Sequence, residues 1–195
     1  MDRKLAVARI EDELQESCRV KQQFSRELKV QIAELAERIA STLASGGVVY
    51  WIGNGGSAAD AQHLAGELVG RLRRARKALA SLALTTNTSL LTSIANDNSY
   101  DEVFSRQVEA LIRPADMLIA LSTSGRSESI LGAVACANER GAFTVGWTGE
   151  TGGALAKLAQ LCLRIPSRDT QRIQEAHITI GHILCGLVED QLAPA

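Results

Sequence analysis

The chain has 195 residues, enough for one domain with a sizeable hydrophobic core. Its formal net charge of −1 argues against a general binder of nucleic acid or other polyanions, so we expect no nucleic-acid partner. No apolar run approaches the roughly eighteen residues that cross a membrane, and the charged N-terminus lacks the apolar core of a signal peptide. We therefore expect a cytoplasmic protein without a membrane partner.

The first 45 residues predict a helical arm. Neither proline nor glycine occurs between Leu5 and Ala44. Apolar residues recur there at three- and four-residue steps, which predicts an amphipathic helix, at Leu28, Ile32, Leu35, Ile39 and Leu43. A second helix precedes it, with apolar positions at Leu5, Ile10 and Leu14. We expect the arm 1–45 to bury its apolar stripe against another subunit of a homo-oligomer, and packing on the chain's own sheet is the alternative.

Beyond Gly47 the sequence alternates short apolar runs with helical patterns. The expected strands are Val48–Ile52, Ser81–Leu84, Met117–Leu121, Thr144–Trp147 and Leu161–Ile165. The expected helices lie near Ser57–Gly70, Ser89–Ala95, Asp101–Leu111, Ser127–Arg140, Gly153–Leu158 and Thr170–Leu192. Strands separated by helices imply parallel pairing through right-handed crossovers. The chain therefore predicts an α/β fold, a three-layer α/β/α sandwich around a central five-stranded parallel sheet, as a single domain 1–195.

The first expected strand runs into a glycine-rich turn, Gly53–Ser57, that opens a helix. Glycines let the backbone approach a ligand, and Ser57 suits the N-cap position. Free N–H groups in the first helical turn attract a phosphate or carboxylate. Four residues apart on this helix, His63 and Glu67 share a face. The stretch predicts an anion cradle beside a His/Glu pair.

A dinucleotide site is the competing interpretation of this turn. Gly53-x-Gly55-x-x-Ala58 fits the loose fingerprint of nicotinamide-binding proteins. That fingerprint also needs an acidic residue at the end of the second strand to hold the ribose. Strand Ser81–Leu84 instead runs into Thr85–Asn87. The missing carboxylate disfavours nicotinamide binding.

A second cradle follows the strand Met117–Leu121. The run Ser122–Ser127 places four hydroxyl side chains around Gly125 at the start of a helix. Such donors at a helix N-terminus bind phosphate without a lysine. The P-loop pattern is missing, which excludes that class of nucleotide hydrolase. The two cradles together predict a phosphorylated small molecule as ligand.

Two further stretches, one after the first cradle and one in the last helix, say less about the ligand. The basic run Arg71–Lys77 resembles a solvated helix end, with Arg71 or Arg73 as possible contacts to an anionic substrate. On the last helix, Gln174 and His182 lie two turns apart, about 12 Å along the axis. Helix geometry alone therefore does not predict a metal site there.

The four cysteines, Cys18, Cys136, Cys162 and Cys185, form no C-x-x-C pair. Buried, inert thiols in a reducing compartment are the expectation.

Taken together, the motifs resemble the phosphoheptose isomerases of the sugar-isomerase (SIS) domain superfamily. The resemblance spans nearly the whole chain and rests on Gly53-Asn-Gly-Gly-Ser57, His63-x-x-x-Glu67, Asn96-Asp97, Ser122-Thr-Ser-Gly-x-Ser127 and Arg172-Ile-Gln-Glu-x-His-x-x-x-x-His182. It implies a SIS domain that converts D-sedoheptulose 7-phosphate to D-glycero-D-manno-heptose 7-phosphate for lipopolysaccharide or other surface polysaccharide. It further implies a homotetramer with active sites between subunits and one zinc ion per subunit.

The resemblance also assigns roles to residues. The implied zinc ligands are His63, Glu67, Gln174 and His182. The implied substrate contacts are Asn54, Gly55, Gly56, Ser57, Asn96, Asp97, Ser122, Thr123, Ser124, Ser127 and Gln174. Moving a proton between C1 and C2 requires a base and an acid, for which we expect Glu67 and His182.

Two points stay open at the level of sequence. A zinc-bound carboxylate is a weaker base than a free one, so either Glu67 leaves the metal when substrate enters or zinc mainly organises the site. The family often carries aspartate where this chain has Gln171, so any role of that carboxylate is lost here.

A sister branch of the superfamily, the non-enzymatic DnaA-initiator-associating regulator of replication, is the main alternative. In that branch the glutamate and the last histidine of the site are typically replaced, whereas Glu67 and His182 are both present here. An isomerase of another sugar phosphate is the third possibility. The retained pair favours the phosphoheptose isomerase.

Overall fold

The computed structural model describes residues 2–193; positions 1, 194 and 195 of the expected 1–195 domain lie outside this part of the chain. The elements, in chain order, are α1 (Arg3–Gln22), α2 (Arg26–Ala44), β1 (Val49–Gly53), α3 (Gly56–Val69), β2 (Ser81–Ala83), α4 (Thr88–Asp97), a 3₁₀ turn η1 (Tyr100–Glu102), α5 (Ser105–Leu111), β3 (Met117–Leu121), α6 (Glu128–Glu139), β4 (Phe143–Thr148), α7 (Leu155–Leu158), β5 (Leu161–Arg164) and α8 (Thr170–Leu192). Within residues 2–193, no helix has the length and apolar character needed to cross a membrane.

The sheet has five strands in the order β2-β1-β3-β4-β5, and each neighbouring pair is parallel. This confirms the predicted parallel α/β fold. The chain places β2 on one side of β1 and β3 on the other, so the winding reverses between β1 and β3. Ligands of open α/β sheets bind outside the carboxyl ends of the strands at such a reversal. Because Gly53 pairs with Leu121, the turns that follow β1 and β3 are neighbours.

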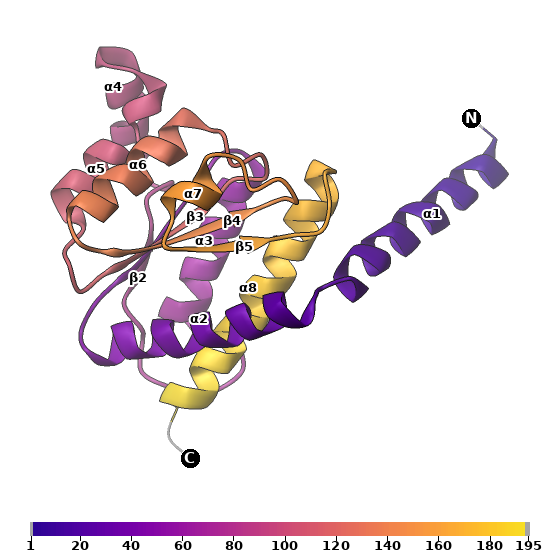
Figure 1. Cartoon of the computed structure of the whole chain (residues 1–195), viewed down its shortest axis with the longest axis horizontal. Coiled ribbons are helices and arrows are strands. Elements are labelled where there is room, and N and C mark those ends of the chain that lie inside the picture. The colour runs from indigo at the N-terminus through magenta and orange to yellow at the C-terminus, as the bar shows by residue number, and fades with distance from the viewer. Residues whose placement is uncertain (1, 194–195) are drawn as a thin grey trace.

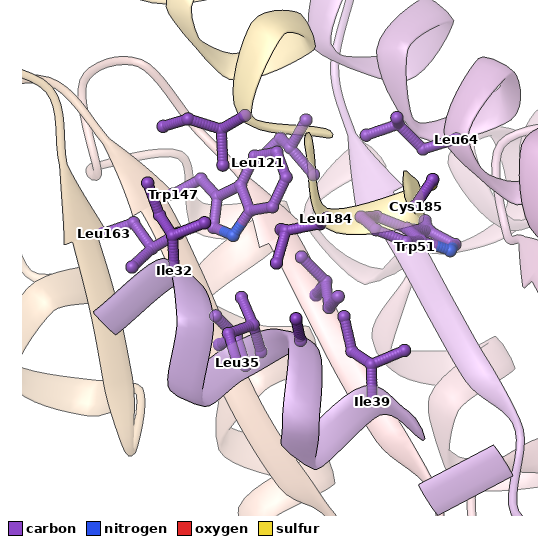
Figure 2. Close-up of a cluster of buried hydrophobic side chains, with 14 of the residues drawn as sticks. Ile32, Leu35, Ile39, Trp51, Leu64, Leu121, Trp147, Leu163, Leu184 and Cys185 are labelled. Carbon is purple, nitrogen blue, oxygen red and sulfur yellow. The ribbon is translucent and has the colours of Figure 1, made fainter. Parts of the chain in front are cut away.

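Alternating side chains divide the core between the two faces of the sheet. Helices α2, α3 and α8 cover one face of the sheet, and α5, α6 and α7 cover the other (Figure 1). On β1, Trp51 packs in the core of the first face and Ile52 in that of the second. In the first cluster the rings of Trp51 and Trp147 meet edge to face, with centroids 5.9 Å apart, among apolar side chains from α2 and α8 (Figure 2). The helices that will carry the site are thus packed on one shared core.

The N-terminal arm divides into two parts. The apolar face of α2 is buried against α8 and the sheet, so for α2 the expected subunit contact is wrong and packing on the chain's own sheet is what occurs. By contrast, α1 projects from the body of the molecule (Figure 1). Its side chains Leu5, Ile10 and Leu14 are 67%, 58% and 63% exposed. Within the arm, contact of α1 with another subunit stays a prediction.

Most predicted boundaries agree with the observed ones to within two residues, and the last helix agrees at both ends. The predicted helix Asp101–Leu111 is wrong in one respect, because it divides into η1 and α5 where Val103 and Phe104 are buried.

The cysteines differ in their surroundings, and all four are unpaired. Cys185 is buried, and its burial raises the pKa of the thiol to about 12. Cys136 and Cys162 are half-buried, and Cys18 is exposed. The expectation of a buried thiol is wrong for Cys18, because α1 projects from the body of the molecule.

Candidate functional site

Three of the predicted metal ligands meet within one chain. His63 Nε2 on α3 lies 2.8 Å from His182 Nε2 on α8. The same His63 nitrogen lies 3.3 Å from Glu67 Oε1. One donor atom from each of the three residues lies within 4.8 Å of the others. The structure therefore brings these three donor groups together, whereas the convergence of Gln174 with His182 stays a prediction.

Close packing of α3 against α8 produces this meeting. A Cβ at Gly181 would collide with the side chain of Leu64, so only glycine permits the two helices to approach this closely. Gly181 and Leu64 are direct chain neighbours of His182 and His63. The sequence alone does not single out Gly181, because its partner Leu64 lies in a distant helix.

Gln174 lies near the N-terminal ends of the same two helices, α3 and α8. A Cβ at Gly56 would fall 2.7 Å from Gln174 Nε2 and 2.9 Å from its Oε1, so the amide sits against the first turn of α3. This places Gln174 beside the first cradle. Its role as a fourth metal ligand stays a prediction.

His177, the third histidine of the chain, is kept apart from the cluster. It is fully buried, its ring centroid is 5.8 Å from that of Trp147, and Nε2 lies 3.4 Å from the carbonyl of Thr148. Burial lowers the pKa of His177 to about 4, so this ring stays neutral in the folded protein at neutral pH.

The donor set of the cluster suits a metal ion. Two imidazole nitrogens and one carboxylate oxygen are a common ligand set of catalytic zinc, which keeps one position for water or substrate. The facing nitrogens of His63 and His182 are so close that at most one of them carries a hydrogen when no cation is bound. A cation would accept both lone pairs in place of that shared proton.

The first cradle differs from its prediction at the helix start. Gly55, with a φ of 55°, occupies the N-cap position of α3, and no side chain caps the first turn. The prediction of Ser57 as N-cap is wrong, because the turn needs a positive φ and Ser57 lies inside the helix, 3% exposed. Backbone carbonyls replace a side-chain cap here, because the N–H groups of Ser57 and Ala58 donate to the carbonyl of Asn54 and that of Ala59 donates to the carbonyl of Gly55.

Asn54 joins the first cradle to the second. Its Nδ2 donates to Ser127 Oγ at 3.1 Å and to Ser129 Oγ at 3.0 Å. Its Oδ1 accepts a hydrogen bond from the Tyr100 hydroxyl at 2.8 Å. Because Ser127 accepts from Asn54 and does not cap α6, its own hydroxyl hydrogen remains available to a ligand. Substrate binding by the Asn54 side chain stays a prediction, since both ends of the amide already have protein partners.

The hydroxyls of the second cradle lie beyond the end of β3. Ser122 is nearly buried, and its N–H donates to the Trp147 carbonyl at 2.9 Å. Thr123 and Ser124 line a surface hollow together with Arg126. Arg168 and Glu150 line the same hollow, so the hydroxyl donors lie beside two arginines and one carboxylate.

The structure does not bring every predicted residue into this group. Asn96 and Asp97 are exposed at the end of α4, where Asn96 Nδ2 donates to Asp97 Oδ1 at 2.8 Å. Helix α4 has no buried residue and stands at the margin of the fold (Figure 1). Substrate contact by this pair stays a prediction.

The basic run is a loop, so its interpretation as a helix end is wrong. Helix α3 ends at Val69, and the Arg76 side chain is buried while Arg71 stays exposed. Arg73 lines a hollow that His182 also borders. An anion contact by Arg73 stays a prediction.

Sequence inspection missed Asp60, which lies three residues before His63 on the same helix face. Its Oδ2 is buried without a hydrogen-bond partner among the described residues. Burial raises the pKa of Asp60 to about 6, although the nearby His63 acts to lower it. The spacing of residues 60, 63 and 67 was an available signal. The missed Tyr100 had no comparable pattern, because its partner Asn54 lies 46 positions earlier.

Comparison with known proteins finds similarity over most of the chain. Residues 14–149 match the family described as the SIS domain. The phosphoheptose isomerase of Rhodospirillum rubrum is 54% identical over 161 residues, which is 83% of this chain and 86% of that protein. The phosphoheptose isomerase of Roseiflexus sp. is 50% identical over 93% of this chain and 92% of its own. The solved phosphoheptose isomerase of Neisseria gonorrhoeae superposes with a TM-score of 0.89 at 40% identity and covers 95% of this chain and 99% of its own.

Proposed function

The chain belongs to the SIS domain family and, within it, to the phosphoheptose isomerases, and from this membership we propose its reaction. It interconverts D-sedoheptulose 7-phosphate and D-glycero-D-manno-heptose 7-phosphate, a ketose and an aldose. The observation that carries the proposal is the meeting of Glu67 with His63 and His182 between the paired helices α3 and α8.

The reaction moves one proton from C1 to C2 of the ketose through an enediol. Glu67 removes the C1 proton and returns a proton to C2, while His182 moves the proton between the two oxygens. The side chain of Glu67 is 19% exposed, open enough to meet a substrate yet largely shielded from water. Glu67 and His182 both lie within 3.3 Å of the same nitrogen of His63, so a carboxylate base and an imidazole are close enough to act on one substrate.

The two cradles hold the rest of the sugar phosphate. The first turn of α3 lacks a side-chain cap, and Ser127 keeps a free hydroxyl hydrogen near it. We propose that Ser122, Thr123, Ser124 and Ser127 bind the phosphate and that Gly55, Gly56, Ser57 and Gln174 face the sugar chain. Support comes from the pairing of β1 with β3, which makes the two turns neighbours.

Zinc is the proposed metal, and His63, Glu67 and His182 would hold it with Gln174 as a fourth ligand; to act as base, Glu67 would leave the metal when substrate enters. A bound zinc ion would supply Lewis-acid polarisation of the substrate's carbonyl and hydroxyl oxygens. The ligand types and their mutual distances support this choice over magnesium or calcium, which prefer all-oxygen sites.

We further propose a cytoplasmic homotetramer that serves lipopolysaccharide or a related heptose-containing polysaccharide. The exposed apolar side chains of α1 support self-association, since a helix with such a stripe gains from covering it. Sites between subunits would then receive additional residues from a second copy.

A substrate and metal comparison tests the proposal. Purified protein is incubated with sedoheptulose 7-phosphate and, separately, with fructose 6-phosphate, and aldose signals are followed by NMR before and after chelation. We expect conversion of the heptulose phosphate, loss on chelation and recovery with added zinc. Preference for fructose 6-phosphate would reject the assigned substrate, and full turnover of a demonstrably metal-free sample would reject zinc.

A further inference from the structure

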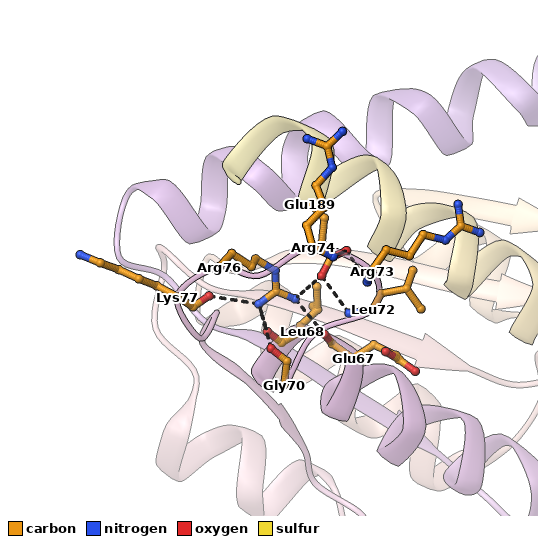
Figure 3. A network of polar contacts seen from close by, with 9 residues as sticks. All are labelled: Glu67, Leu68, Gly70, Leu72, Arg73, Arg74, Arg76, Lys77 and Glu189. Carbon is orange, nitrogen blue, oxygen red and sulfur yellow. Dashed lines mark hydrogen bonds and ion pairs between the residues drawn. The ribbon is translucent and has the colours of Figure 1, made fainter. Parts of the chain in front are cut away.

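A buried ion pair closes the loop that leaves α3. Arg76 Nη2 lies 3.1 Å from Glu189 Oε1, and both side chains are only 1% exposed (Figure 3). Glu189 belongs to α8, seven residues beyond His182, and so lies on the same side of that helix about 10 Å away. Its carboxylate also accepts the backbone N–H groups of the loop, from Leu72 at 2.8 Å, Arg73 at 2.9 Å and Arg74 at 3.2 Å.

The same arginine closes the C-terminal end of α3. Arg76 Nη2 donates to the carbonyl of Glu67, and Nη1 donates to the carbonyl of Leu68, each at 2.8 Å. Nη1 also lies 3.3 Å from the carbonyl of Gly70 and 3.1 Å from that of Lys77. Carbonyls in the last turn of a helix lack helical partners, and a cation suits the negative end of the helix dipole. Arg76 therefore holds the backbone of the residue whose carboxylate meets His63.

We propose that Arg76 and Glu189 are positioning residues, which together fix Glu67 on α3 against His182 on α8. The chain of contacts runs from the Glu67 carbonyl through Arg76 to Glu189 and along α8 to His182. Its consequence for catalysis rests on the proposed function.

Fold stability alone does not account for this arrangement. The cost of removing two charges from water commonly offsets their attraction, so a buried ion pair adds little net stability. The same loop and helix are also joined by Arg74 and Asp190, 3.0 Å apart and 52% and 59% exposed. That exposed pair does not contact the α3 carbonyls through its side chains. It is therefore a matched control for the buried pair.

The test compares Glu189→Gln and Arg76→Lys with the control Arg74→Ala. Lysine keeps the charge and can still pair with Glu189, but it lacks the second nitrogen that spans the carbonyls of Glu67 and Leu68. Ring-nitrogen NMR spectra of the metal-free proteins report the histidines directly, and the chain has only three. Zinc affinity by chelator competition and the kinetic constants of the zinc-loaded proteins are measured alongside.

We expect both buried-pair variants to shift the ring signals of His63 and His182 and to leave His177 unchanged. Zinc affinity and kcat should each fall about tenfold, the scale of lost second-shell support, with KM changed less than twofold. The control should match the wild type. If Glu189→Gln does not fold, Arg76→Lys gives the same readouts.

Unshifted His63 and His182 signals in a folded variant would overturn the proposal, even where its melting temperature falls. A wild type without isomerase activity would instead remove the proposed function, and the histidine spectra would still decide the positioning.

Discussion

At the scale of the residue, the site depends on a carboxylate and two imidazoles that come from distant parts of the sequence. The spacing of His63 and Glu67 within one helix made that half of the cluster predictable from sequence. His182 lies 119 positions after His63, and no local pattern indicates that their ring nitrogens meet. Only the family resemblance had joined them. The limit is physical, because helix periodicity fixes a face but not what that face touches.

Replacement of Glu67 by glutamine should abolish most turnover while the fold persists. The amide keeps the shape of the side chain but cannot remove a proton, so we expect kcat to fall by about 10²- to 10⁴-fold. Progress curves with sedoheptulose 7-phosphate measure this loss, and thermal unfolding of the metal-free protein measures stability. Glu37→Gln, at an exposed position on α2, should behave as wild type. Retained turnover in the Glu67 variant would remove this residue as the base.

Replacement of Asp60 by asparagine should stabilise the metal-free protein at alkaline pH. The folded-state pKa of Asp60, about 6, lies above its ordinary value of 3.8. The protonated carboxyl of Asp60 is favoured in the folded state, so its contribution to the free energy of unfolding is complete below pH 3.8. This contribution is lost as the pH rises through about 6. Allowing for partial exposure, we expect the variant to gain about 1 kcal/mol at pH 8 and nothing near pH 4. Urea unfolding at both pH values measures the difference, and equal stabilities at pH 8 would contradict it.

At the scale of the element, the contact between α3 and α8 decides where the site forms. The strands and most helices followed from alternation and periodicity, since these patterns report local burial. The loop Arg71–Lys77 could not be predicted in this way. A run of basic residues ordinarily predicts a solvated surface, whereas here Arg76 is buried in an ion pair with Glu189. The division of the N-terminal arm was equally beyond pattern reading. Both α1 and α2 carry apolar side chains, but α2 buries its apolar face within the chain, whereas α1 buries only Val20 near its C-terminal end.

Gly181→Ala tests the helix contact. Alanine ordinarily favours a helix over glycine by about 1 kcal/mol, but here its Cβ would collide with Leu64. We expect a net loss of about 1–3 kcal/mol in unfolding free energy together with reduced kcat, because overpacking displaces the neighbouring His182. Chemical denaturation and steady-state kinetics measure the two effects.

The control for this substitution lies on the same helix. A Cβ at Gly186 would meet only Leu72 Cδ2, at an ordinary 3.8 Å, so Gly186→Ala should stabilise the protein and leave kcat unchanged. Equal behaviour of the two alanine variants would show that close approach at Gly181 does not matter.

At the scale of the whole molecule, the strand order makes the turns after β1 and β3 neighbours, and α1 exposes an apolar stripe. The five-stranded parallel sheet could be predicted because strands and helices alternate along the sequence. The positions of Asn96 and Asp97 could not be derived in this way. They lie on the exposed helix α4, whose location depends on few contacts with the rest of the fold.

Charged substitutions on α1 test the proposed assembly. Ile10→Glu combined with Leu14→Glu puts two carboxylates on the exposed stripe, so we expect the tetramer to dissociate into smaller species at micromolar concentration. Sedimentation velocity measures the mass. Leu111→Glu is the control, because Leu111 is also an exposed apolar residue but lies on α5. An unchanged mass for the double variant would reject α1 as the assembly surface.

The most direct measurement follows sedoheptulose 7-phosphate in deuterated water with the zinc-loaded protein, by proton and carbon NMR. An enediol mechanism with Glu67 as base predicts an aldose 7-phosphate that carries deuterium at C2, because a carboxylate proton exchanges with solvent. If the folded, metal-loaded protein leaves the ketose unchanged, or if the Glu67→Gln variant forms the deuterated aldose at the wild-type rate, the proposed action of Glu67 is contradicted.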